Sequence, residues 1–151
     1  MKNKRGQFYL LASIIIITLI AGIFAVTNYS RKSEGTKVYN LAEELKIESG
    51  KFLDRSAVTG SYDWNSFTSN FSSYVGNSIE IVYIVGKLEG YEVYKYDDSG
   101  NKNMSLSSSL NGEVLTVNVE GINYDFKLKE GQNFYFIMYQ YIGKEKYVAR
   151  N

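Results

Sequence analysis

One segment near the N-terminus limits what this chain can become. Residues 8–26 form a continuous apolar run without a charged side chain, interrupted only by the hydroxyls of Ser13 and Thr18. A helix of this length spans about 28 Å at ~1.5 Å per residue, close to the hydrocarbon thickness of a bilayer. The sequence therefore predicts a membrane-spanning helix over residues 7–32.

Basic residues on both sides of the run bear on its orientation. Three precede it and three follow it: Lys2, Lys4 and Arg5, then Arg31, Lys32 and Lys37. The nearly even count weakens the usual rule that positive loops stay inside. Orientation then depends on the short basic segment that precedes the run. We expect a cytoplasmic N-terminus with residues 33–151 outside the cell membrane.

Two other interpretations compete with this one. A secretory signal peptide usually has an apolar region of ~7–15 residues and a small-residue cleavage site. Here the run is longer, and residues 26–30, Val-Thr-Asn-Tyr-Ser, contain no Ala-x-Ala site. A plain signal anchor, as in any single-pass membrane protein, remains an open alternative.

The junction before the run adds a second signal. Lys4, Arg5, Gly6 and Gln7 lie directly before the apolar residues, an arrangement that resembles the class III signal peptide of archaeal type IV pilins and pilin-like proteins. In that family a prepilin peptidase cuts after the glycine on the cytoplasmic side, and the apolar segment stays on the mature protein. The resemblance covers mainly residues 1–32. It implies a basic leader of residues 1–6 and a mature chain that begins at Gln7.

Physical roles for the junction follow from this resemblance. Gly6 lets an extended backbone enter a protease cleft without obstruction, and anionic headgroups attract Lys4 and Arg5 to the inner membrane surface. Bacterial pilins usually carry a glutamate soon after the cleavage site, and many archaeal relatives a serine and a glutamate. Residues 8–11 here are Phe-Tyr-Leu-Leu, so this chain has no glutamate at those positions. We therefore do not expect a charged contact between such a glutamate and the amino terminus of a neighbouring subunit.

Assembly of such subunits depends on small side chains. Moving an apolar helix from lipid to a neighbouring helix gives little hydrophobic free energy, because both surroundings are apolar. Close packing of the two helices therefore has to supply the attraction. Thr18, Ala21, Gly22 and Ala25 lie on one helical face. Small residues are common in any membrane helix, so the sequence leaves homo- or hetero-oligomerisation with other pilin-like subunits open.

The composition argues against several classes of function. The chain has no His and no Cys, which excludes imidazole or thiolate zinc sites and His-activated nucleophiles. We therefore expect that the protein is not an enzyme and binds no cofactor. Without Lys2, Lys4 and Arg5, 14 of the 17 basic side chains remain against 16 acidic ones, so the near-neutral body lacks the basic surface that nucleic-acid binding requires.

Residues 33–151 predict a single α+β head domain without disulfides. A helical pattern from Lys37 to about Val58 places Val38, Leu41, Leu45 and Phe52 on one apolar stripe. It either continues the first helix through Gly35 or begins separately near Thr36. Thr59-Gly60-Ser61 ends it.

A short aromatic helix follows, with Asp63 as its expected N-cap. Trp64, Phe67, Phe71 and Tyr74 recur at helical spacing. An aromatic surface for glycans is one interpretation of this stripe. A buried amphipathic face is favoured, because aromatic residues at this spacing normally pack a core.

Beyond Asn77 the hydrophobic period changes to two, which predicts an antiparallel sheet of five or six strands. The strands expected are residues 79–85, 91–96, 114–119, 122–128 and 134–142, with 105–109 as a weak edge strand or a loop. The first and last are apolar on both faces and should be central. In the fourth, Ile122, Tyr124, Phe126 and Leu128 should face the core.

Two sequence features could be read as a metal site and as glycosylation sites. Asp97-Asp98-Ser99-Gly100-Asn101 lacks the ligand spacing of a calcium loop, so it predicts a turn and we expect no metal. Asn28, Asn70 and Asn103 begin Asn-x-Ser sequons. Asn103, on an expected loop, is the strongest glycosylation candidate.

Two functions fit these observations. The leading hypothesis is a structural subunit, cut by a prepilin peptidase, that resides in the membrane or in a surface filament. The alternative is a single-pass protein that does not polymerise and displays a binding or adhesion domain outside the cell. The sequence does not identify a ligand of the head.

Overall fold

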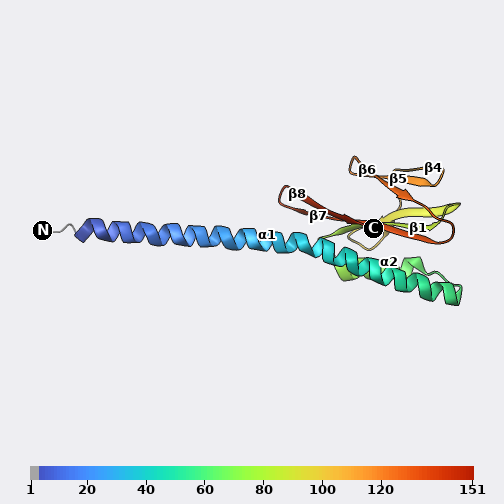
Figure 1. Ribbon diagram of the computed structural model, residues 1–151, viewed down its shortest axis with the longest axis horizontal. Coiled ribbons are helices and arrows are strands. Elements are labelled where there is room, and N and C mark those ends of the chain that lie inside the picture. The colour runs from blue at the N-terminus through green and yellow to red at the C-terminus, as the bar shows by residue number, and fades with distance from the viewer. Residues whose placement is uncertain (1–3) are drawn as a thin grey trace. The chain divides into compact units, whose positions relative to one another are not determined.

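The computed structural model describes the backbone of residues 4–151 and the side chains of residues 9–30 and 35–151 (Figure 1). The chain forms two compact units, residues 1–36 and 37–151. The second unit is the head. It contains the end of the first helix, a second helix and all the strands.

Helix α1, Lys4–Thr59, has no break at Gly35. The helical pattern predicted after Lys37 is therefore part of α1, which decides between the two alternatives that the sequence leaves open. Within the head, α1 buries Val38, Leu41 and Leu45, as predicted, whereas Phe52 is only half-buried. The helix ends at Gly60, whose φ of +70° suits a glycine and whose N–H donates to the Ser56 carbonyl at 2.8 Å.

Helix α2, Trp64–Val75, begins at the predicted cap. The Asp63 carboxylate accepts a hydrogen bond from the Ser66 N–H at 3.1 Å. Phe71 is buried, as predicted, but Tyr74 is 65% exposed. Val75 takes the buried position one turn after Phe71, which leaves Tyr74 on the flank of the apolar stripe.

The strands form two antiparallel sheets rather than one. Their bounds are β1 Glu80–Lys87, β2 Gly90–Tyr96, β3 Lys102–Asn103, β4 Ser108–Asn111, β5 Val114–Val119, β6 Ile122–Lys127, β7 Asn133–Ile142 and β8 Glu145–Arg150. The orders are β3-β2-β1-β7-β8 and β4-β5-β6. β1 and β7 are interior strands, as predicted. The serine-rich segment contributes an exposed edge strand, β4.

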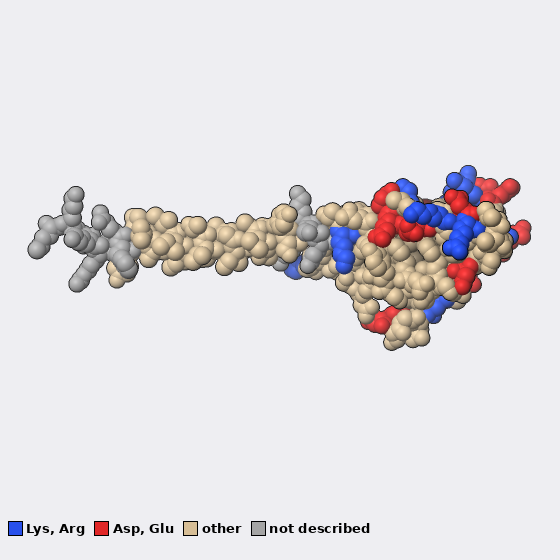
Figure 2. Space-filling model, turned by 90° about the horizontal axis from the view of Figure 1, so that it is seen from below, with Lys and Arg blue, Asp and Glu red and all other residues tan. Residues whose placement is uncertain are grey.

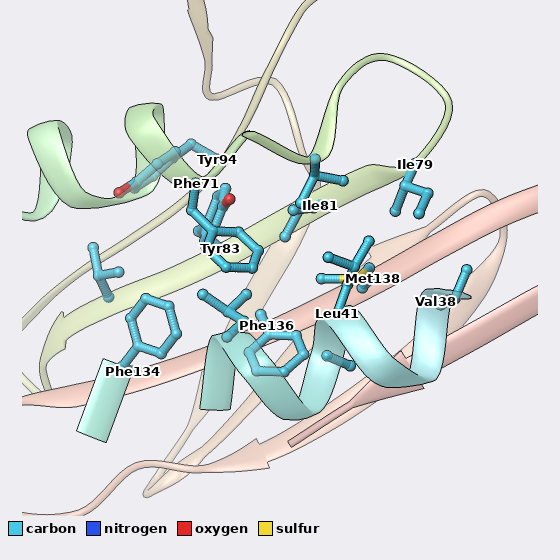
Figure 3. Packing of buried hydrophobic residues seen from close by; sticks show 14 residues of the cluster. Val38, Leu41, Phe71, Ile79, Ile81, Tyr83, Tyr94, Phe134, Phe136 and Met138 are labelled. Atoms are coloured by element: carbon cyan, nitrogen blue, oxygen red, sulfur yellow. The ribbon is translucent and has the colours of Figure 1, made fainter. Parts of the chain in front are cut away.

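The five-stranded sheet has α2 and the end of α1 on one face and β4–β6 on the other (Figure 1), and an apolar cluster lies on each face. Tyr83, Phe136 and Met138 project toward α1 and α2, where they join Leu41 and Phe71 in one cluster (Figure 3). The intervening residues of the same strands belong to a second cluster with β5 and β6; they are Val82, Ile84, Ile137 and Tyr139. The head therefore has three layers and two cores.

One prediction about the second core is wrong. Tyr124, Phe126 and Leu128 are buried, but Ile122 is 49% exposed. Ile122 pairs with Val119 next to the hairpin turn of β5 and β6. An alternating pattern identifies the face of a strand, but it does not show how far the covering layer extends.

Hydroxyl groups connect α2 to the sheet beneath it. Thr68 Oγ1 lies 3.0 Å from the hydroxyls of both Tyr94 and Tyr96. Ser72 Oγ lies 2.8 Å from the Tyr83 hydroxyl. Because Tyr83, Tyr94 and Thr68 are fully buried, these bonds satisfy groups whose burial would otherwise be costly.

We predict that the head loses stability above about pH 10. Burial raises the pKa of the Tyr94 phenol to about 12, and it raises the pKa of Tyr83 as well. The folded state thus holds the phenolic protons more tightly than the unfolded chain does. This contribution is complete below pH 10 and is lost as the pH rises toward 12. Urea unfolding of the full chain in detergent micelles at several pH values measures it.

The Tyr94→Phe variant is the control for this prediction. It should be less stable at neutral pH, because the hydrogen bond with Thr68 is lost, and its stability should fall less steeply at high pH. Unfolding midpoints that stay constant between pH 9 and 12 in the unsubstituted protein contradict the prediction.

Candidate functional site

Two parts of the molecule carry functional information, the apolar segment of α1 and a cleft in the head. In the first, an 18-residue window of α1 is apolar enough to cross a membrane, and none of it is buried. Large aliphatic side chains such as Ile14, Ile17 and Ile23 are more than half exposed. Figure 2 shows this stretch without acidic or basic side chains, which gather instead on the head.

Hydroxyl groups within the apolar segment are satisfied by their own helix. Ser13 Oγ donates to the Tyr9 carbonyl at 2.9 Å, and Thr18 Oγ1 donates to the Ile14 carbonyl at 2.8 Å. Thr27 makes the same contact with Ile23. Lipid offers no hydrogen-bond partners, so such internal bonds make these residues compatible with a membrane.

The predicted packing residues lie along one face of this helix. Thr18, Ala21, Gly22 and Ala25 are all exposed, and a Cβ built on Gly22 would meet no atom within 4 Å apart from the adjacent residues and the backbone of its own helix. The predicted processing residues, Lys4 to Gln7, fall at the start of α1. Their side chains lie outside the described residues.

The three sequons differ in their settings. Asn28 and Asn70 are exposed on helices, whereas Asn103 lies at the end of the short strand β3. The Asn103 carboxamide oxygen accepts hydrogen bonds from the Ser105 N–H at 2.9 Å and the Ser105 hydroxyl at 2.6 Å. These bonds join the first and third residues of the sequon in a local turn.

The cleft has a volume of about 810 Å³ and lies at one end of the head. Three segments form it: residues 62–65 at the start of α2, the β1–β2 turn with its flanking residues, and residues 130–132 before β7. The turn itself is formed by Leu88 and Glu89, between the end of β1 at Lys87 and the start of β2 at Gly90. These segments are far apart in the sequence, so single-sequence patterns did not reveal the cleft.

Aromatic and acidic side chains line this cleft. The rings of Tyr62 and Trp64 stack with centroids 6.2 Å apart, and Trp64 in turn stacks on Phe134 at 5.2 Å. The ionisable lining residues are Asp63, Lys87, Glu89, Glu92 and Glu130, which amount to four carboxylates and one ammonium group. The cleft is therefore acidic with an aromatic wall.

Several of these charges already have partners. Hydrogen bonds from Ser66 lower the pKa of the Asp63 carboxyl, and Glu92 forms an ion pair with Lys102 at 2.5 Å. Across the described part of the chain, no three carboxylates come close enough together to hold a metal ion. The Asp97 segment is a turn, as predicted, in which the Asp97 carboxylate accepts backbone hydrogen bonds from Ser99 and Asn101.

No protein-family model, curated protein or solved structure matches this chain.

We predict that Gly86→Ala distorts the wall of the cleft. Gly86 has a φ of +120°, and a Cβ built on it would lie 2.4 Å from the Gly90 carbonyl oxygen. A conformation this unfavourable for L-residues costs about 1–3 kcal/mol. Urea unfolding of the two proteins in micelles measures the difference in free energy.

Gly90→Ala is the matched control, because a Cβ there meets no atom within 4 Å. It should change the free energy of unfolding by less than about 1 kcal/mol. Equal effects of the two substitutions would show that the close approach at Gly86 does not constrain the turn.

Proposed function

We propose that this chain is a pilin-like structural subunit anchored in the cell membrane, with its head outside. The observation that supports this proposal best is that two parts of α1 differ in the exposure of their apolar side chains. Residues 9–30 expose apolar side chains, whereas residues 38–45 bury an apolar stripe inside the head. The first part requires lipid or neighbouring helices as its surroundings, and the second forms part of a folded domain.

Processing after Gly6 is the part of the proposal that rests on the resemblance of residues 1–32. Cleavage there removes the charged leader and retains the apolar segment, so the mature chain would begin at Gln7. A plain signal anchor retains Met1 instead. A cleaved secretory signal would leave a mature chain without the apolar run.

We predict that the native protein, extracted from its own membranes, begins at Gln7. Intact-mass spectrometry with N-terminal peptide mapping identifies the first residue. A Gly6→Val variant should keep the leader, because the branched side chain obstructs the extended backbone in the protease. An intact Met1 in the unsubstituted protein, or a start beyond Val26, contradicts pilin-type processing.

Assembly into a filament is a separate step with its own prediction. Gly22→Leu should abolish or strongly reduce filaments, because a large side chain keeps neighbouring helices apart, while insertion into the membrane is preserved. Electron microscopy of sheared surface material detects filaments, and membrane fractionation checks insertion.

Ser13→Leu is the matched control for Gly22→Leu. Ser13 lies nine residues away, about two and a half turns, on the opposite face of the helix. It exchanges a small residue for leucine at an equally exposed position. Unchanged filaments in Gly22→Leu, or equal losses in both variants, refute packing through the Thr18–Ala25 face.

The second candidate function, a membrane-anchored binding protein, is favoured by the cleft. Its volume is in the range of small-molecule sites, and polar and aromatic groups converge on it. In that case the protein would keep its apolar helix in lipid and would not form filaments.

A further inference from the structure

The three sequons lie in different backbone settings, and only one of them is open to an enzyme that attaches a glycan. Asn103 ends the two-residue strand β3, an edge strand of the five-stranded sheet. The next four residues, 104–107, form neither helix nor strand and connect this sheet to β4. Asn103, Met104 and Ser105 are all exposed. A transferase can therefore reach the whole acceptor sequence from the solvent.

The other two sequons lie in helices. Asn70 is in the middle of α2, and the third residue of its sequon, Ser72, has its hydroxyl 2.8 Å from that of the buried Tyr83. Presenting the Ser72 hydroxyl to an enzyme would break this contact and unwind the helix. Asn28 lies within α1, two residues beyond the apolar run that ends at Val26. In a membrane this position lies at the level of the headgroups, where the helix restricts access to its backbone.

The local hydrogen bonds of Asn103 bear on the reactivity of its carboxamide. An amide nitrogen is a poor nucleophile, because its lone pair is delocalised into the carbonyl group. The Ser105 N–H and hydroxyl both donate to Asn103 Oδ1, at 2.9 and 2.6 Å. When Nδ2 loses a proton, negative charge moves to Oδ1, and two donors already placed there stabilise it. Both bonds use the oxygen rather than Nδ2, the atom that a glycan would join.

We propose that the folded head is glycosylated at Asn103 and not at Asn28 or Asn70. Nδ2 of Asn103 attacks the anomeric carbon of a lipid-linked glycosyl phosphate, which supplies the sugar. The bond between that carbon and the phosphate oxygen breaks, and the lipid phosphate leaves with the bonding electron pair. A base of the transferase takes the proton from Nδ2.

The inference rests on one part of the proposed function, the location of the head outside the membrane. N-glycosylation acts on secreted proteins and domains, so a head on the cytoplasmic side would not be a substrate. Processing after Gly6 and assembly into filaments are not required.

Peptide mapping of the native protein, extracted from its own membranes, tests the inference. Basic residues separate the three sequons along the chain, so trypsin places each sequon in a different peptide. The peptide that contains Asn103 should gain the mass of a glycan, and fragmentation should locate the glycan on this residue. The peptides that contain Asn28 and Asn70 should keep their unmodified masses.

Substitutions made in the native host test the two groups that the chemistry needs. Asn103→Gln should lose the glycan completely, because the acceptor has to be asparagine. Ser105→Ala should also lose it, because the hydroxyl donor is removed, whereas Ser105→Thr should keep it. Asn101→Gln is the matched control, since Asn101 is exposed two residues earlier but begins no sequon. This variant should keep the glycan.

A membrane-impermeant amine reagent, applied to intact cells, tests the location of the head separately. Lys127 and Lys129 are exposed and serve as its targets. Labelled lysines together with an unmodified Asn103 overturn the inference and leave the proposed function standing. Unlabelled lysines together with an unmodified Asn103 contradict both.

Two patterns of modification also contradict the inference. Equal glycan occupancy at Asn103 and Asn70 would show that the transferase acts before α2 folds, so that the fold does not select the site. A glycan that persists in Ser105→Ala would show that the hydroxyl contact with Asn103 is not needed.

Discussion

The fold of the head depends on one sheet that is apolar on both faces. Along β1, Tyr83 and Val82 point to opposite sides, and both are fully buried. Such a strand is stable in water only if each face is covered by a separate layer. The helices supply one cover and β4–β6 supply the other. The chain has no cysteine, so hydrophobic burial and the hydroxyl contacts under α2 have to hold these layers together.

The same helix meets two different environments. From Val38 onward an apolar stripe at helical spacing, Val38, Leu41 and Leu45, is buried, while none of the charged side chains of this part is buried. Before Thr27 the apolar residues surround the helix on every side and are exposed. That stretch is long and apolar enough to cross a membrane. Its composition, rather than the fold of the head, gives it this property.

Much of the head could be predicted from the sequence, because hydrophobic period and caps are local signals. The Asp63 cap, the Gly60 stop, and the interior positions of β1 and β7 are all confirmed. The separation into two sheets was missed, since alternation defines the faces of a strand but not its partners. Ile122 was misplaced for a related reason, because its burial depends on where the covering layer ends.

The cleft shows a further limit of local patterns. Its walls come from three segments that only the fold brings together, and the aromatic pattern of α2 predicted a core position for Trp64. That prediction holds in part: Trp64 packs on Phe134, yet its buried Nε1 has no hydrogen-bond partner. Across the described residues, few buried side-chain polar atoms lack a partner, and two of them belong to Trp64 and Gln132, which line this cleft. The aromatic wall and the excess of carboxylates in this cleft therefore arise from the fold, and no local pattern of the sequence could have assembled them.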